Sequence, residues 1–229
     1  MPQILKVDLH THTAEDPYEK INYNACQLID RASKEGYDVL AITNHDTITY
    51  NKELAEYARE KGILLIPGTE AQFSNKHVLI INPGFKEVPL GKQLKYLGKI
   101  KRATSLIIAP HPFFPSSISL KSDFLSHFSS FDAIEFSFYY NHLINCNKKA
   151  AQVAYDSKMP LIGSSDCHSL WQFGTTYSLV KAKKETFSII EAIKKGEIEV
   201  STTPLSLISM ARIAINSFWG RKLKVSFRL

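Results

Sequence analysis

The sequence predicts an α/β fold in which strands and helices alternate and the strands close into one β/α barrel. Short apolar segments rich in β-branched and aromatic residues recur along the 229-residue chain. Segments with a helical spacing of apolar residues lie between them, and repeated strand–helix units are typical of a parallel sheet. Seven or eight such units within about 200 residues favour a closed barrel over an open sheet.

Eight segments are predicted to be strands, because each is short and is bounded by glycine, proline or polar residues. They are residues 4–9, 39–43, 64–67, 78–81, 106–109, 133–138, 161–164 and 177–180. Four segments carry apolar residues at helical spacing, namely residues 24–35, 52–61, 147–157 and 185–195. Gly62 and Gly196 directly follow the second and fourth of these, and glycine commonly stands just past a helix C-terminus.

The chain contains no internal repeat, low-complexity segment or linker, which favours one domain over residues 1–200. Residues 201–229 are expected to form a C-terminal helix and a basic tail packed on the same domain. This segment holds five basic residues and no acidic one, so the first 200 residues carry 23 basic and 22 acidic side chains. The basic character therefore belongs to the tail, which argues against a nucleic-acid-binding face across the body.

The tail allows two interpretations. Residues 205–219 are an apolar helical stretch followed by the basic segment 220–225, a combination typical of helices that lie in a membrane interface. In the interpretation that we favour, the stretch is a last helix that closes the barrel and its basic end is solvated. A weak contact of the tail with a membrane surface is the alternative interpretation, and no obligate protein partner is evident.

The cysteines and the N-terminus indicate a location. The three cysteines are odd in number and form no C-x-x-C pair, which is typical of a reducing compartment. The N-terminus lacks the apolar core of a signal peptide, and no stretch reaches the roughly 18 to 20 apolar residues of a membrane span. We therefore expect a cytoplasmic protein.

Most of the eight histidines end or flank a predicted strand and have a carboxylate nearby. The segments are Asp8-Leu9-His10-Thr11-His12 with Asp16, Asn44-His45-Asp46, Gly68-Thr69-Glu70, His77, Pro110-His111-Pro112 and Ser165-Asp166-Cys167-His168. Imidazole and carboxylate groups hold catalytic divalent metals. The carboxyl ends of barrel strands converge on one rim, where active sites form. The series therefore predicts several metals on one rim, and metals held in this way usually catalyse hydrolysis.

Individual positions carry different weight. His10 and His12 are two residues apart at a strand end, so their rings point to the same side. His77 opens a strand, and it reaches the rim only through a hairpin that starts near Glu70. Asp46 by itself is explained equally well as a helix cap. Capping does not explain the joint pattern, because a cap does not require histidine. Glu135 also lies late in a predicted strand, whereas His127 is interpreted as an ordinary surface or core histidine.

These ordered segments resemble the four-motif signature of the polymerase and histidinol phosphatase (PHP) superfamily. The resemblance spans residues 8 to 168 and leaves the tail uncovered. It implies a distorted seven-stranded β/α barrel that carries two or three divalent ions, Mn, Zn or Fe, on its C-terminal rim. It also implies cleavage of phosphomonoesters or phosphodiesters.

Carried over residue by residue, the resemblance implies three metal sites. The first is held by His10, His12, Glu70 and Asp166; the second by Glu70, His77 and His111; the third by Asp16, His45 and His168. The residue at position 16 stands four residues after His12 rather than the family's usual five, so Glu15 is an alternative ligand. Cys167 replaces a small residue and is interpreted as a packing residue.

The expected reaction is in-line attack on phosphorus by a metal-bridging hydroxide, because clustered cations neutralise the phosphate and lower the pKa of water. His45, Glu70 and Asp46 are the catalytic candidates, with Asp46 as a proton carrier or an orienting residue. Two alternatives remain open: another β/α-barrel metal hydrolase of the amidohydrolase type, and a non-catalytic metal-binding PHP scaffold.

The substrate is expected to be a small phosphorylated molecule, with a nucleotide or a short oligonucleotide favoured. Four residues are expected to bind it, namely Tyr139, Tyr140, His142 and Trp171, and Lys76 and Gln172 are further candidates. The aromatic side chains can stack on a base. Packing within the rim loops is an equally good interpretation of them.

Overall fold

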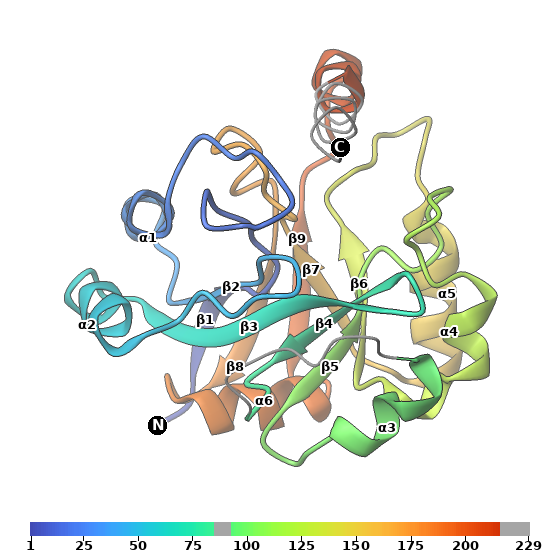
Figure 1. Cartoon of the computed structure of the whole chain (residues 1–229), viewed down its shortest axis with the longest axis horizontal. Coiled ribbons are helices and arrows are strands. Elements are labelled where there is room, and N and C mark those ends of the chain that lie inside the picture. The colour runs from blue at the N-terminus through green and yellow to red at the C-terminus, as the bar shows by residue number, and fades with distance from the viewer. Residues whose placement is uncertain (85–92, 216–229) are drawn as a thin grey trace, which may run out of the picture.

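The structure is a computed structural model that describes residues 1–84 and 93–215. Its described part contains one nine-stranded sheet, curved into a nearly closed barrel, with the order β7-β6-β5-β4-β3-β2-β1-β8-β9 (Figure 1). The strands are β1 Gln3–Asp8, β2 Val39–Ile42, β3 Leu64–Phe73, β4 Lys76–Ile81, β5 Leu106–Ala109, β6 Ala133–Ser137, β7 Leu161–Ser164, β8 Thr176–Ala182 and β9 Ile198–Thr202. All eight predicted strands are present; β3 runs to Phe73, six residues past its predicted end, and all other ends agree within two residues.

The prediction of seven strands in a parallel sheet is wrong in two respects. The sheet has nine strands rather than seven, because all eight individually predicted segments belong to it and Ile198–Thr202 adds β9 alongside β8. The pairs β1–β2, β2–β3, β5–β6 and β6–β7 are parallel, whereas β4, β8 and β9 run antiparallel to their neighbours. A direct hairpin replaces the helical crossover between β3 and β4, and antiparallel strands need no crossover helix.

The two ends of the sheet approach each other where β7 meets β8 and β9. Gly163 on β7 has no side chain, and a Cβ there would lie 2.7 Å from the Tyr177 carbonyl oxygen and 2.8 Å from Val200 Cγ1. Ser178 Oγ donates to the Gly163 carbonyl and accepts from the Gly163 N–H, both at 2.9 Å. The Ser178 hydroxyl therefore satisfies the N–H and carbonyl groups of Gly163. In an ordinary strand pair these groups would bond to the backbone of the neighbouring strand.

The helices pack on the outside of the sheet. They are α1 Ala25–Lys34, α2 Lys52–Glu60, α3 Leu97–Ile100, α4 Ser122–Ser126, α5 Asn147–Ser157 and α6 Thr186–Lys194, with 3₁₀ turns η1 Leu94–Tyr96 and η2 Phe128–Ser130. The four predicted helices correspond to α1, α2, α5 and α6. Asn24 caps α1 in a reciprocal pair with Gln27, and the Asn51 side chain caps α2, which explains where both helices begin.

Three apolar clusters support the barrel. One fills its interior and continues under α6; it includes Leu5, Val39, Ile108 and Ile189. A second lies between the sheet and α1 and α2, and a third lies beneath α3, α4 and α5 on the opposite side (Figure 1). Because apolar packing surrounds the sheet, the carboxyl ends of its strands are held firmly relative to one another.

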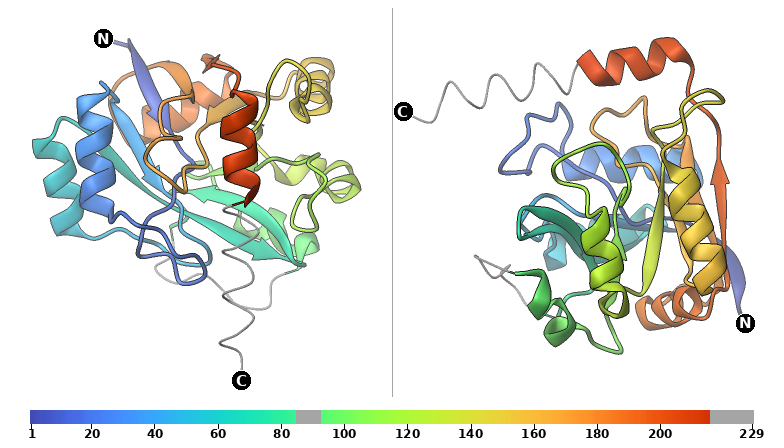
Figure 2. Two further views of the ribbon diagram at one scale, coloured as in Figure 1. Left: turned by 90° about the horizontal axis from the view of Figure 1, so that it is seen from above. Right: turned by 90° about the vertical axis from the view of Figure 1, so that its right-hand side faces the viewer.

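Residues 207–215 form a further helix above the rim that carries the carboxyl ends of the strands (Figure 2). Met210 and Ile213 on this helix pack against Phe138, Tyr139 and Trp171. The basic tail segment from residue 216 onward, including the segment 220–225, lies outside the described residues. Within the described ranges, no helix combines the length and apolar character that crossing a bilayer requires.

Candidate metal centre

Glu70 lies at the middle of a buried cluster on this rim and contacts five imidazole rings. Its Oε2 atom lies 3.4 Å from His10 Nε2, 3.3 Å from His12 Nε2 and 3.1 Å from His45 Nε2. Its Oε1 atom lies 2.7 Å from His77 Nδ1 and 3.3 Å from His111 Nε2. The predicted rim residues are therefore brought together around one carboxylate that two cations can share.

The β3–β4 hairpin brings His77 to the rim. Ser74 and Asn75 form its turn and have φ angles of 50° and 62°, as a tight two-residue hairpin requires. His77 pairs with Gln72 across the two strands. The prediction that His77 reaches the rim through a hairpin from Glu70 is confirmed by this pairing.

Asp166 enters the cluster from the end of β7. Its Oδ1 atom lies 3.3 Å from His10 Nε2 and 3.4 Å from His12 Nε2. The backbone at Asp166 has φ 43°, and at His111, after β5, φ is 29°. Non-glycine residues seldom adopt such angles, and they cluster at functional sites where the surrounding structure enforces them.

The cluster fits a divalent cation by two tests. His10 Nε2 and His12 Nε2 are fully buried and form no hydrogen bond, although buried polar atoms are nearly always satisfied. Both nitrogens lie 3.3 to 3.4 Å from carboxylate oxygens of Glu70 and Asp166. Donor atoms about 2.1 Å from one cation are separated by roughly 3.0–3.4 Å. Nitrogen and oxygen donors without thiolate suit Mn²⁺, Zn²⁺ or Fe²⁺.

Two carboxylates, Glu135 and Asp16, face the Nδ1 atoms of the histidine rings, on the side opposite the Nε2 atoms that face Glu70. Glu135 Oε1 lies 2.7 Å from His10 Nδ1, and its Oε2 accepts the His111 backbone N–H at 2.7 Å. Asp16 Oδ2 lies 2.7 Å from His45 Nδ1 and 3.3 Å from His12 Nδ1. Carboxylates in this position fix the ring orientation of metal-binding histidines. The sequence placed Glu135 among the strand-end polar groups but not in the ligand set.

Asp16, and not Glu15, belongs to the cluster. Asp16 is buried and accepts the His45 backbone N–H at 2.8 Å. Glu15 is exposed, and its carboxylate accepts the Ala25 N–H at the start of α1. The sequence left these two residues as alternatives, and their contacts distinguish them.

His168 lies at the mouth of the cluster beside a carboxylate that the sequence did not single out. The rings of His45, His12 and His168 are stacked in that order, with centroid separations of 4.6 and 4.4 Å. Glu19 Oε2 lies 2.6 Å from His168 Nε2, and the two side chains are 38% and 32% exposed. Glu19 follows no strand, so the pattern of strand ends gave no signal for it.

The mutual contacts change the pKa values throughout the cluster. Burial by itself would lower the pKa of His10, but Asp166, Glu135 and Glu70 raise it well above its usual value. The same competition between burial and neighbouring carboxylates raises the pKa of His12, His45 and His168 to about 9. Burial opposes ionisation of Glu70, yet the surrounding histidines hold its pKa well below the usual range.

Two further predicted residues lie close to the centre. Asp46 follows His45 with φ 49°; its backbone N–H donates to the Glu70 carbonyl at 3.1 Å, and its Oδ1 accepts the Gln72 N–H. Cys167 is fully buried in the cluster beneath α1, where burial raises the pKa of its thiol to about 12. A buried, protonated thiol that bonds to the Tyr23 hydroxyl and the Ser169 carbonyl agrees with the interpretation of Cys167 as a packing residue.

The residues predicted to bind substrate have other contacts. Tyr139 Oη donates to the Met210 carbonyl at 3.3 Å, and Trp171 lies under the Arg212 guanidinium at 4.8 Å. Tyr140 is buried against Phe136, and His142 is exposed. Within residues 1–84 and 93–215, none of these four side chains forms a hydrogen bond, ion pair or ring contact with the histidine cluster. His127 also lies outside it, bonded to the Asp123 carbonyl.

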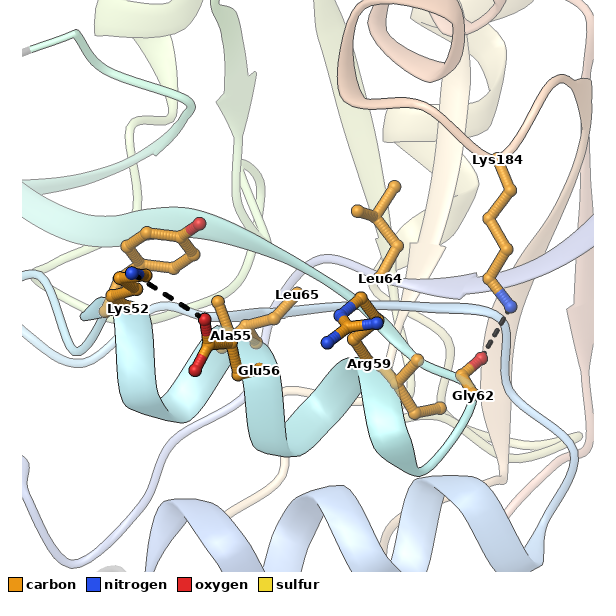
Figure 3. A pocket seen from close by; sticks show the side chains of 10 residues that line it. Lys52, Ala55, Glu56, Arg59, Gly62, Leu64, Leu65 and Lys184 are labelled. Atoms are coloured by element: carbon orange, nitrogen blue, oxygen red, sulfur yellow. Dashed lines mark hydrogen bonds and ion pairs between the residues drawn. The ribbon is translucent and has the colours of Figure 1, made fainter.

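A separate surface groove of about 660 Å³ runs along α2 (Figure 3). Its walls carry Lys52, Glu56, Arg59 and Lys184, and Lys184 donates to the Gly62 carbonyl at 2.6 Å. None of the histidines lines this groove. The chemistry-bearing residues therefore lie at the rim and not in this hollow.

Parts of this chain are similar in sequence to a known family and to a known protein. A family model described as PHP-associated matches residues 145–198. The uncharacterized protein MJ1587 of Methanocaldococcus jannaschii is 30% identical over 122 residues, which cover 48% of this chain and 70% of that protein.

Solved structures share the fold. A two-domain Bacteroides vulgatus protein containing a predicted PHP-like metal-dependent phosphoesterase superposes with a TM-score of 0.69 at 19% identity, covering 96% of this chain and 70% of that one. Endonuclease Q, in complex with a 27-mer duplex that has an abasic lesion at its active site, gives a TM-score of 0.63 at 15% identity, covering 93% and 67%.

Proposed function

The chain belongs to the PHP superfamily, and we propose that it is a metal-dependent phosphoesterase. The single observation that carries the proposal is the pair of buried, unbonded nitrogens, His10 Nε2 and His12 Nε2, which face the carboxylates of Glu70 and Asp166. A buried polar atom without a hydrogen bond is costly, and a cation among these donor atoms would remove that cost.

The proposed sites follow the contacts. His10, His12, Glu70 and Asp166 would hold one divalent ion, and Glu70, His77 and His111 would hold a second. Such ions neutralise a phosphate ester, lower the pKa of water and stabilise the leaving oxygen. The protein itself contributes a buried, pre-arranged donor set, in which Glu135 and Asp16 orient the rings through hydrogen bonds to Nδ1.

Asp46 is the residue that we propose as proton carrier. It is half-buried beside His45, and its backbone is tied to β3 through the Glu70 carbonyl. A carboxylate that reaches the substrate would take up a proton as the nucleophile forms and release it to the leaving oxygen.

A nucleotide or a short oligonucleotide is the substrate class that we propose. The structural likeness to endonuclease Q, which is seen bound to duplex DNA, supports a nucleic-acid phosphodiester among the candidates. The aromatic residues Tyr139 and Trp171 pack against the helix of residues 207–215, and this helix lies above the same rim (Figure 2). The proposed substrates include nucleotide phosphomonoesters as well as phosphodiesters.

The test is a phosphoester panel with Mn²⁺-loaded protein, including p-nitrophenyl phosphate, mononucleotides, 3′,5′-bisphosphates, short RNA and abasic duplex DNA. We expect wild-type turnover on at least one substrate. The His10→Ala, Asp166→Ala double variant should lose at least about a thousandfold in rate, because it removes a nitrogen and an oxygen ligand of the first site. His127→Ala is the matched control, since this histidine lies outside the cluster.

Several outcomes contradict the proposal. A double variant that keeps the full phosphoesterase rate would exclude the first site as the catalytic one. Turnover of amides instead of phosphoesters would favour an amidohydrolase-type barrel, and a metal-loaded protein that is silent on the whole panel would favour a non-catalytic scaffold.

A further inference from the structure

The loop between β1 and α1 presents two carboxylates to the histidine cluster at different places. Asp16 reaches the Nδ1 atoms of His12 and His45, whereas Glu19 reaches His168. Asp16 Oδ1 accepts the backbone N–H groups of Tyr18 and Glu19 at 2.8 and 2.9 Å. These two hydrogen bonds close a turn, and the turn fixes the backbone position from which the Glu19 side chain extends.

The ring of His168 has a defined proton arrangement. Its Nδ1 atom lies 2.9 Å from the Asp166 backbone carbonyl, and a carbonyl only accepts hydrogen bonds, so Nδ1 carries the proton. Without a cation Nε2 carries a proton as well, because it faces a Glu19 oxygen that only accepts, and a cation bound at Nε2 would replace this proton. Backbone carbonyls fix the tautomer of metal-binding histidines in this way. Nε2 is also the atom that lies 2.6 Å from Glu19.

The oxygens of Asp16 are engaged with the chain itself. Oδ1 binds two backbone N–H groups, and Oδ2 binds the His45 N–H and its ring Nδ1. The rings of His12 and His45 turn their opposite nitrogens, Nε2, toward Glu70. Asp16 therefore lies on the outer side of both rings, which is the place of an orienting carboxylate rather than of a ligand to His168.

We propose that Glu19 and His168 Nε2 hold the outermost divalent cation of the centre, and that Asp16 is a positioning residue for His12 and His45. This assignment rests on the metal centre of the proposed function and replaces Asp16 by Glu19 in the third site. With two protein ligands, a hard cation there takes its remaining ligands from water or from substrate phosphate oxygens. The site is accordingly the weakest of the centre and the one nearest to an incoming substrate.

The experiment is a Mn²⁺ titration followed by the electron paramagnetic resonance signal of free Mn²⁺. It compares the full-length wild type with Glu19→Gln, Asp16→Asn and Glu15→Gln. Glu15→Gln is the matched control, because it makes the same change in the same loop at an exposed residue. Thermal unfolding of each metal-free variant checks that it is folded.

We expect the wild type to show tight and weak classes of Mn²⁺ sites. Glu19→Gln should weaken the weak class at least tenfold and leave the tight class unchanged. Asp16→Asn should weaken the tight class, because His12 and His45 lose their orienting carboxylate. Glu15→Gln should superimpose on the wild type.

The assignment is overturned if Glu19→Gln superimposes on the wild type, if it weakens both classes alike, or if Asp16→Asn alone removes the weak class. A wild type with a single class of sites also overturns it. Phosphoesterase activity is a separate readout: a wild type with both classes and no turnover contradicts the proposed function but leaves the Glu19 assignment intact.

Discussion

The inner and outer halves of the metal centre are built differently. The inner half, Glu70 with His10, His77 and His111, comes from strands or from residues directly at strand ends, and its side chains are at most 10% exposed. The outer half, Glu19 with His168, comes from two loops, and about a third of each side chain is exposed. Strands embedded in a packed sheet fix donor atoms closely, whereas loops allow adjustment. On the proposed assignment, cations in the inner half would exchange slowly and a cation in the outer half would exchange readily.

The largest expected effect concerns the support of the inner half. Glu135 accepts two hydrogen bonds, from the His10 ring and from the His111 N–H. Glu135→Gln keeps the shape but leaves one oxygen for two donors, and its new NH₂ group faces a donor. Loss of such a carboxylate typically lowers metal affinity about 10- to 100-fold. We expect the tight class of Mn²⁺ sites to weaken by this factor while the weak class changes less.

The Mn²⁺ titration described for Glu19→Gln also measures the effect of Glu135→Gln on the tight class. Together the two variants test the inner and the outer half separately. If Glu135→Gln affected only the weak class, the division into inner and outer halves would be wrong. Glu191→Gln, a change at an exposed residue paired with Lys195 on α6, is a suitable control.

The same division explains what the sequence could predict. Glu70, His111 and Asp166 follow from strand ends, since apolar runs mark the strands and barrel geometry brings their carboxyl ends together. His77 required the additional assumption of a hairpin, which the β3–β4 pairing confirms. Glu19 lies seven residues after His12 in a loop, and no periodicity reports the direction of a loop side chain. Its partner is chosen by tertiary contacts that appear only in the folded chain.

The missed strand has a similar cause. Residues 198–202 read Ile-Glu-Val-Ser-Thr, an alternating but only half-buried segment, which is a weaker signal than the buried runs of β2 or β5. The seam at Gly163 and Ser178 depends on contacts between β7 and β8. Sequence patterns describe one element at a time and do not report such contacts.

An intermediate effect is expected from pH in the metal-free protein. The pKa values of His12, His45 and His168 are raised from 6.5 to about 9 in the folded protein. Their protonated forms therefore stabilise the fold fully below about pH 6.5, and this stabilisation is lost as the pH rises through about 9. Each kcal/mol corresponds to about 2–4 °C in Tm for a chain of this size. We expect the Tm in the presence of a chelator to fall by several degrees between pH 6.5 and 9.5.

Scanning calorimetry with and without Mn²⁺ checks this expectation. Metal binding requires deprotonated imidazoles, so the Mn²⁺-loaded protein should not lose stability over the same range. A chelated protein whose Tm stays constant or rises with pH would mean that the histidines are not held in their charged form by the neighbouring carboxylates.

The smallest effect is expected beside the outer half, where the helix of residues 207–215 packs on the rim. Tyr139 Oη donates to the Met210 carbonyl at 3.3 Å, and such a hydrogen bond contributes about 0.5–1.5 kcal/mol. Tyr139→Phe should therefore lower Tm by no more than a few degrees. It should leave both classes of Mn²⁺ sites and kcat/KM unchanged, because a phenyl ring stacks on a base as well as a phenol does. If instead kcat/KM on an oligonucleotide fell tenfold at an unchanged Tm, the hydroxyl would contact substrate rather than the helix. Tyr139 would then belong to the substrate-binding surface beside the outer half.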